Sequence, residues 1–258
     1  MGSLEDINLH TLIHSYAICI YQYKAHPNDT NQLFTTPAFS KLKILNGDLN
    51  RNFTNEGLAH LPHLTALHCG ANRNFTNEGL AHLPHLTALY CGANRNFTNE
   101  GLAPLHNLTT LYCSQNNNFT DEGLAHLSHL TVLYCGVNQK FTNQGLAHLP
   151  HLNELHCGSN NNFTDHGLVP LHDLTRLHCY ENTNFTNEGL VSLPNLIELH
   201  CGANINFTNE GLAPLHNLTI VDSGRNNNIT TRGMKYYYVR GLIYSQEGVL
   251  IGKYDRDL

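Results

Sequence analysis

The most constraining feature of this sequence is a 22-residue unit that recurs almost unchanged from Asn52 to about Asn226. Two consecutive copies read NFTNEGLAHLPHLTALHCGANR and NFTNEGLAHLPHLTALYCGANR, and further copies follow without insertion or deletion. The step is marked by seven cysteines: Cys69, Cys91, Cys113, Cys135, Cys157, Cys179 and Cys201. A period of this length is typical of a solenoid, in which each unit buries its apolar side against its neighbours. We therefore expect one continuous array.

Set in phase, one unit reads Leu64-x-x-Leu67-x-Cys69-x-x-Asn72. This pattern resembles the leucine-rich repeat family, whose signature is L-x-x-L-x-L-x-x-N/C-x-L with one short strand per turn. Cysteine stands in the third-leucine slot, where it can act as a small buried hydrophobe. The resemblance implies an α/β solenoid, a curved array with a parallel in-register β-sheet on the concave side. Short α or 3-10 helical turns are expected on the convex side.

The residues of one unit lead to the same architecture. Strand alternation places Leu67 and Cys69 on the buried face and leaves His68 on the other. Asn72 and its equivalents are expected to bond backbone groups as an asparagine ladder, and Phe75 and its copies to form an aromatic spine. The return segment begins with Thr76 and Asn77, residue types that cap helices. Because it also contains glycine and proline, we expect a single helical turn there.

Three segments are predicted along the chain. Residues 1–41 form an N-terminal helical cap, with a helix over residues 3–24, and an entry segment. Residues 42–234 form the solenoid, with about 8–9 coils of 22 residues. Residues 235–258 form a C-terminal cap resembling a β-hairpin. Such caps are expected because the ends of an open solenoid would otherwise expose its apolar core.

Composition narrows the classes of partner. The formal net charge is −6 and charged residues make up 13% of the chain, which argues against nucleic acid as a partner. The sequence has no CxxC pair, no secretory signal and no apolar run long enough to cross a bilayer. We therefore expect a cytoplasmic monomer with reduced thiols, no membrane partner and no cofactor. The cysteine column is interpreted as a buried thiol ladder.

The concave strand face carries the candidate binding residues. Its middle column consists mainly of tyrosines and histidines one coil apart, which can stack on each other. Small residues in the next column are expected to leave the ring faces open. A few positions, such as Glu154 and Arg176, break the repeat consensus. The candidate partner-binding residues are Tyr90, Tyr112, Tyr134, Glu154, His156, Arg176, His178, Tyr180, Glu181, Glu198, His200 and Asp222.

These residues favour a non-enzymatic protein–protein interaction module that binds an unidentified partner through the concave face, since Tyr and Arg are enriched at binding hot spots. One alternative is a structural or neutral repeat array whose rings only stack on each other. By resemblance, another is an adaptor or substrate receptor of a ubiquitin-ligase-like complex. A minor alternative is metal binding by His156, His178 and His200, whose ligand type suits zinc. Against it, in-register parallel strands hold the rings in a line, whereas tetrahedral ligation needs converging side chains. No catalytic residues are predicted, because Ser223, beside Asp222, falls in the buried slot.

Overall fold

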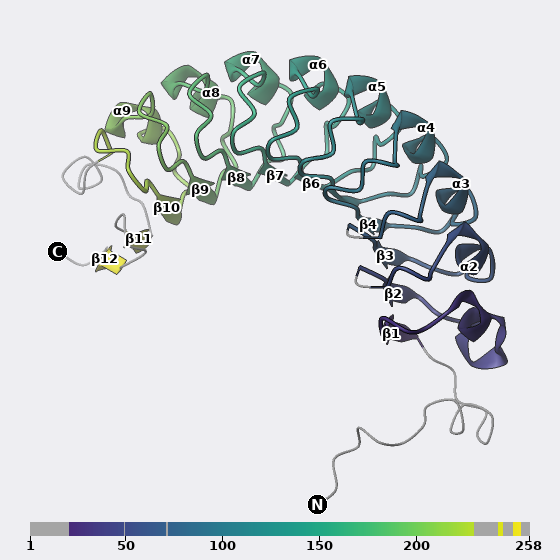
Figure 1. Ribbon diagram of the computed structural model, residues 1–258. Coiled ribbons are helices and arrows are strands. Elements are labelled where there is room, and N and C mark those ends of the chain that lie inside the picture. The colour runs from purple at the N-terminus through teal and green to yellow at the C-terminus, as the bar shows by residue number, and fades with distance from the viewer. Residues whose placement is uncertain (1–20, 49, 71, 230–241, 245–249, 254–258) are drawn as a thin grey trace, which may run out of the picture.

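The computed structural model describes residues 21–48, 50–70, 72–229, 242–244 and 250–253. Within them the chain winds into an arch whose inner side is lined by strands and whose outer side carries short helices (Figure 1). One sheet follows the arch, with its strands in chain order from β1 to β12. The expected solenoid, with a parallel sheet on the concave side and helical turns on the convex side, is therefore confirmed.

The strands keep the step of the sequence repeat. From β1 to β11 each strand begins 22 residues after the previous one and pairs with it in parallel, and β12 pairs with β11 in the antiparallel direction. The strands are β1 (Gln22–Lys24), β2 (Ile44–Asn46), β3 (Ala66–His68), β4 (Ala88–Tyr90), β5 (Thr110–Tyr112), β6 (Val132–Tyr134), β7 (Glu154–His156), β8 (Arg176–His178), β9 (Glu198–His200), β10 (Ile220–Asp222), β11 (Leu242–Tyr244) and β12 (Leu250–Lys253).

The convex segments form single helical turns of four or five residues, as predicted. Each α-helix begins with Asn or Asp and contains a buried glycine. They are α2 (Asn55–Ala59), α3 (Asn77–Leu80), α4 (Asn99–Leu102), α5 (Asp121–Leu124), α6 (Asn143–Leu146), α7 (Asp165–Leu168), α8 (Asn187–Val191) and α9 (Asn209–Leu212), preceded by the 3-10 helices η2 (Asn31–Thr35) and η3 (Pro37–Phe39). In the described part of the chain no helix has the length and apolarity needed to span a membrane.

The repeated leucines, cysteines and phenylalanines form one continuous core. In a typical coil Leu67, Cys69 and Phe75 are completely buried, and so are their counterparts in the coils up to that of Leu199, Cys201 and Phe207. Burial raises the pKa of each of the seven repeat thiols above its ordinary value, so these cysteines remain neutral. All seven are free. The predicted thiol ladder and phenylalanine spine are confirmed.

The asparagine ladder is also confirmed. The side-chain amide of Asn72 donates to the carbonyl oxygen of Asn50, one coil earlier, at 2.7 Å. Its Oδ1 accepts from the backbone N–H of Asn74 at 2.9 Å, which fixes the turn that leaves the sheet. The same pair of bonds recurs in later coils, for example at Asn116 and Asn138. Each buried amide thus ties two coils together while satisfying backbone groups that would otherwise be unpaired.

A second ladder runs along the helix starts, where the sequence predicted only helix caps. Asn77 donates to Thr98 Oγ1 of the next coil at 2.8 Å, and the Thr98 N–H donates back to Asn77 Oδ1 at 3.0 Å. The Thr76 side chain makes no cap bond to its own helix. Gly101 lies against this amide, because a Cβ there would fall 2.5 Å from Asn77 Oδ1. The helical glycine is therefore required by the contact between coils.

A left-handed residue follows the strand in successive coils. Val137 has φ 64°, and Ala93, Gln115, Ser159, Glu181 and Ala203 have φ between 59° and 65°. L-residues with side chains disfavour this region, β-branched residues most of all. Each of these coils therefore contains one strained backbone position, and the residue at that position is not glycine.

The N-terminal prediction is wrong where the structure describes it. Gln22–Lys24 forms strand β1 and not the end of a helix over residues 3–24, whose first part lies outside the described residues. Tyr23 lies 22 residues before Leu45 and pairs with it in register, so the repeat geometry begins one coil earlier than expected. The Tyr23 ring packs edge-on against Phe39 at 5.0 Å. Strands β11 and β12 lie within residues 235–258, which were expected to form the hairpin-like cap, and the division into three segments remains a prediction.

Candidate functional site

The concave face carries a continuous stack of aromatic rings, one from each of seven strands. Ring centroids of successive residues lie 3.6 to 4.5 Å apart. The stack consists of His68, Tyr90, Tyr112, Tyr134, His156, His178 and His200. All of these separations are below the strand spacing of about 4.8 Å because side chains on the inner side of an arch converge. The predicted stacking is confirmed.

The expectation that the ring faces are open is wrong. Each ring is only partly exposed, because the rings of the neighbouring coils cover its faces. What the stack presents to solvent is its ring edges, hydroxyl groups and imidazole nitrogens. The face therefore offers directional hydrogen-bonding groups, with less flat apolar surface than the sequence suggested.

Four of the predicted residues gather around Glu154 in strand β7. Its Oε1 accepts from the Tyr134 hydroxyl at 2.5 Å and lies 2.8 Å from His156 Nε2. Its Oε2 pairs with the Arg176 guanidinium at 2.7 Å. Partial burial opposes ionisation, but these three partners outweigh it and lower the pKa of Glu154 to about 2. Glu154 is thus a fixed anion, and Arg176 extends from it with 48% of its side chain exposed.

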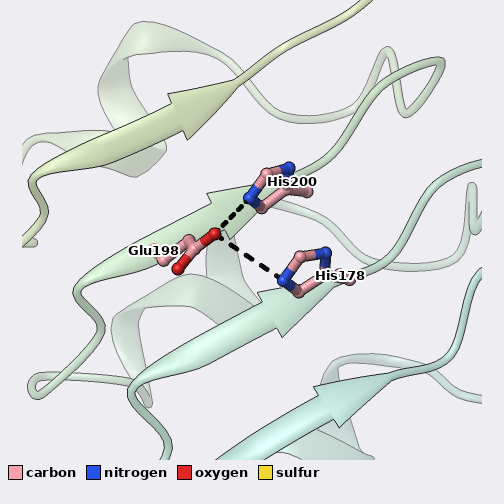
Figure 2. A group of neighbouring side chains, drawn as sticks. All are labelled: His178, Glu198 and His200. Atoms are coloured by element: carbon pink, nitrogen blue, oxygen red, sulfur yellow. Dashed lines mark hydrogen bonds and ion pairs between the residues drawn. The ribbon is translucent and has the colours of Figure 1, made fainter. Parts of the chain in front are cut away.

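A second cluster of five predicted residues lies one to three coils further along. Glu198 Oε1 lies 2.5 Å from His200 Nε2 and 3.9 Å from His178 Nε2, as Figure 2 shows. On the other side of the His200 ring, Nδ1 lies 2.9 Å from the Tyr180 hydroxyl and 3.4 Å from Asp222 Oδ2. The Tyr180 hydroxyl donates to Asp222 at 2.7 Å, so this bond spans two coils.

Glycine at position 202 makes room for this reach. A Cβ there would lie 2.9 Å from Tyr180 Cδ1, so the tyrosine ring lies directly over Gly202 on its way to Asp222. Most coils have glycine in the repeat slot of Gly202, and Tyr180 is the one tyrosine in that slot. The space left by the glycine one coil later is therefore what accommodates the tyrosine ring.

The remaining predicted residues lie outside these two clusters. Tyr90 and Tyr112 belong to the ring stack, and Glu181 accepts a hydrogen bond from the Ser159 hydroxyl at 2.8 Å. Ser223 is buried, as expected for the inward slot. The structure thus joins nine of the twelve predicted residues into two polar clusters on strands β6 to β10 and the turns after them.

One feature of this face was missed by the sequence reasoning. A cavity of about 750 Å³ lies near the N-terminal end, lined by Asp48, Arg51, Gly70, Arg73, Asn74, Gly92 and Ala93. Arg51 and Arg73 occupy the same slot in successive coils, and Arg95 follows in the next. The sequence signal for this cavity was arginine at a 22-residue step in three coils. In later coils the same slot holds uncharged residues, one of which is a glutamine followed by a lysine.

Comparison with known proteins supports the fold. No protein-family model and no curated protein match the sequence. Among solved structures, internalin C2 from Listeria monocytogenes str. 4b F2365 is similar with TM-score 0.55 and 24% identity, covering 74% of this chain and 84% of that one. An octameric complex of Latrophilin 3, Unc5D and FLRT2, the last represented by its leucine-rich repeats, gives 0.56 and 16%, covering 82% and 81%.

TLR13 in its complex with ssRNA13 is also similar, with TM-score 0.55 and 19% identity. The match covers 92% of this chain but 31% of that one, so this chain spans about a third of its length. Together with the parallel strands at 22-residue steps and the asparagine ladder, these likenesses identify the fold. The chain has a leucine-rich-repeat fold.

Proposed function

We propose that this protein is a non-enzymatic interaction module that binds a protein partner through its concave strand face. The observation that carries the proposal is the grouping of Arg176, Tyr180 and Glu181. All three are exposed, all three break the repeat consensus, and each is held by a partner side chain. Because their geometry is fixed before binding, a partner would lose less conformational entropy on contact.

The chemistry of this surface fits a protein partner. Arginine and tyrosine are enriched at binding hot spots, where a few well-packed side chains contribute most of the binding energy. Here Arg176 and Tyr180 project beside a stack of ring edges that can accept and donate hydrogen bonds. The FLRT2 repeats are described in a complex with other proteins, which is consistent with this use of the fold. Fold alone does not assign function, so the proposal depends on the site.

The partner is proposed to be a protein, and neither nucleic acid nor a membrane. The negative formal charge of −6 opposes the general attraction that phosphate backbones require. We also propose that the chain acts as a cytoplasmic monomer. An adaptor role in a ubiquitin-ligase-like complex would be a refinement of the same binding function.

The competing proposal is a structural repeat array without a dedicated ligand. The observation in its favour is that the ring stack covers its own faces and needs no partner to do so. The two proposals differ in what they require of Arg176, Tyr180 and Glu181. A purely structural array would have no specific partner whose recovery depends on exposed Glu181.

The test is a quantitative pulldown with wild-type and variant chains of equal thermal stability. Tyr180→Ala, Arg176→Glu and Glu181→Lys should each reduce recovery of the same partner at least about tenfold, the effect expected when a hot-spot side chain is removed. His82→Ala and His85→Ala on exposed surface outside the concave face are the controls and should leave recovery unchanged. Equal losses from both surfaces, or no loss from the concave variants, would overturn the assignment.

A further inference from the structure

We propose that His178, Glu198 and His200 form a binding site for a divalent transition metal of the zinc class. This inference does not depend on the proposed protein partner. The three side chains come from neighbouring strands β8 and β9, and one ligand atom from each lies within 4.8 Å of the others (Figure 2). Two imidazoles and one carboxylate are a ligand set that zinc accepts, with the fourth position open to water or a ligand.

Tetrahedral metal ligation needs side chains that converge on one point, which the line of histidines alone does not provide. Glu198 supplies the second direction. The histidines alone lie in a line, with rings stacked at 4.0 Å and nearly parallel. Glu198 sits two residues before His200 on the same strand, and its carboxylate turns across the stack toward both Nε2 atoms. In a tetrahedral zinc site the ligand atoms are about 3.3 Å apart, since zinc–ligand distances are about 2.0–2.1 Å. The two Glu198 separations, 2.5 and 3.9 Å, lie on either side of that value, and the two imidazole nitrogens lie within 4.8 Å of each other, so shifts of up to about 1.5 Å would be sufficient.

A comparison within the same molecule supports a cation at Glu198. Glu154 occupies the equivalent slot two coils earlier and also lies beside a histidine, His156. There the next coil supplies Arg176, whose guanidinium neutralises the carboxylate. The next coil after Glu198 has Ile220 in that slot. Within the described part of the chain, the ion-pair partners of Glu198 are His178 and His200, without any arginine or lysine.

The hydrogen bonds of His200 direct a lone pair toward the same point. Since the Tyr180 hydroxyl donates its proton to Asp222, its oxygen is free to accept from His200 Nδ1–H, and Asp222 lies beside that bond. In the neutral ring the Nε2 atom then carries a lone pair, and it faces the Glu198 carboxylate at 2.5 Å. In this tautomer Nε2 is available as a metal ligand, whereas in the other neutral tautomer Nε2–H would donate a hydrogen bond to Glu198. A histidine held through its other nitrogen by a carboxylate is the usual support for a metal ligand.

Both imidazoles of the proposed site can be reached from solvent. The side chains of His178 and His200 are 18% and 19% exposed, which gives an ion access from solvent and leaves the rings room to turn.

The test uses the full chain purified without a histidine tag and freed of metal with a chelator that is then removed. Titration with zinc chloride at pH 7.4, followed by calorimetry, should show one saturable site. His178→Ala and His200→Ala should each weaken zinc binding at least about tenfold, and Glu198→Gln should do the same. His85→Ala is the matched control, because His63 and His85 also face each other across neighbouring coils, with ring centroids 6.4 Å apart. It should leave zinc binding unchanged.

Cobalt provides a second readout that a structural effect of the variants would not reproduce. Co²⁺ bound with tetrahedral geometry absorbs visible light far more strongly than the hydrated ion, and the absorption should vanish in His200→Ala. Circular dichroism of the metal-free variants confirms that they are folded. Absence of saturable zinc binding, or equal zinc binding by wild type and all four variants, would overturn the proposal. If a hydrogen bond between His200 and Glu198 persists and no metal enters, zinc will produce no heat and no change in the imidazole resonances, which also overturns the proposal.

Discussion

The ion-pair cluster of Glu154 makes the stability of the fold depend on pH in a calculable way. Tyr134, His156 and Arg176 lower the pKa of this carboxyl from 4.5 to about 2. One pKa unit corresponds to about 1.4 kcal/mol, so the ionised carboxylate contributes about 3 kcal/mol to the free energy of unfolding. The side chain is 11% exposed, so solvent screens this interaction little.

The sign follows from the lowered pKa. Between about pH 2 and 4.5 the unfolded chain holds a proton on Glu154 that the folded chain does not, so stability rises with pH in this window. Above it the contribution is complete, and it is lost as the pH falls toward 2. Glu154→Gln cannot ionise. It should therefore be about 3 kcal/mol less stable than wild type at pH 7, and this difference should shrink toward zero near pH 2.

Urea unfolding followed by circular dichroism at pH 7, 4 and 2.5 measures this difference by linear extrapolation. Glu78→Gln, which removes an exposed carboxylate from helix α3, is the matched control and should change stability by less than about 0.5 kcal/mol. A Glu154→Gln difference that stays constant from pH 7 to 2.5 would contradict the reasoning.

Three further outcomes follow from the coil geometry. Val137 has φ 64°, a backbone conformation that glycine adopts without strain, and its side chain is largely exposed. Val137→Gly should therefore raise the free energy of unfolding by about 1 kcal/mol. A destabilised variant in thermal unfolding would refute this. Gly123→Ala should lower the free energy of unfolding by about 1–3 kcal/mol, because the new Cβ would lie 2.6 Å from Asn99 Oδ1. This loss is expected even though alanine favours helices. In a double-mutant cycle, Asn99→Ala should remove most of the loss. The seven repeat thiols are buried and their pKa values are raised, so they should react with a thiol reagent only after the chain is unfolded in urea. Rapid labelling of the native chain would count against the buried ladder.

Much of the coil was predictable because each slot repeats and so its role can be inferred from its pattern. The burial of Leu67, Cys69 and Phe75 and the backbone bonds of Asn72 follow from residue type and spacing. The first coil escaped prediction because Tyr23 and Ala25 replace the signature residues there, although the 22-residue step still aligns them with Leu45 and Gly47. Where the identity of a residue departs from the pattern, only its spacing remains as a signal.

The candidate site was harder to predict because side-chain reach is not encoded in spacing. The sequence placed Glu198, His200 and Asp222 on one face, and strand geometry alone indicated a line of groups that could not converge. In the structure, Tyr180 crosses Gly202 to Asp222 and Glu198 turns across two rings. The helix-start ladder was missed for a similar reason, since Asn77 bonds to the next coil instead of capping its own helix.

The asparagine and threonine ladders also determine how such a chain can change its length. The ladder bonds that join coils link residues 19 to 25 positions apart, so each ladder ties a coil to its immediate neighbours. Removing or copying one whole unit in the gene would bring together ends that already match, and every ladder would close again on the next coil. The arch could therefore lengthen or shorten by single units without a new fold, and the near-identity of neighbouring copies is the sequence trace expected of such growth.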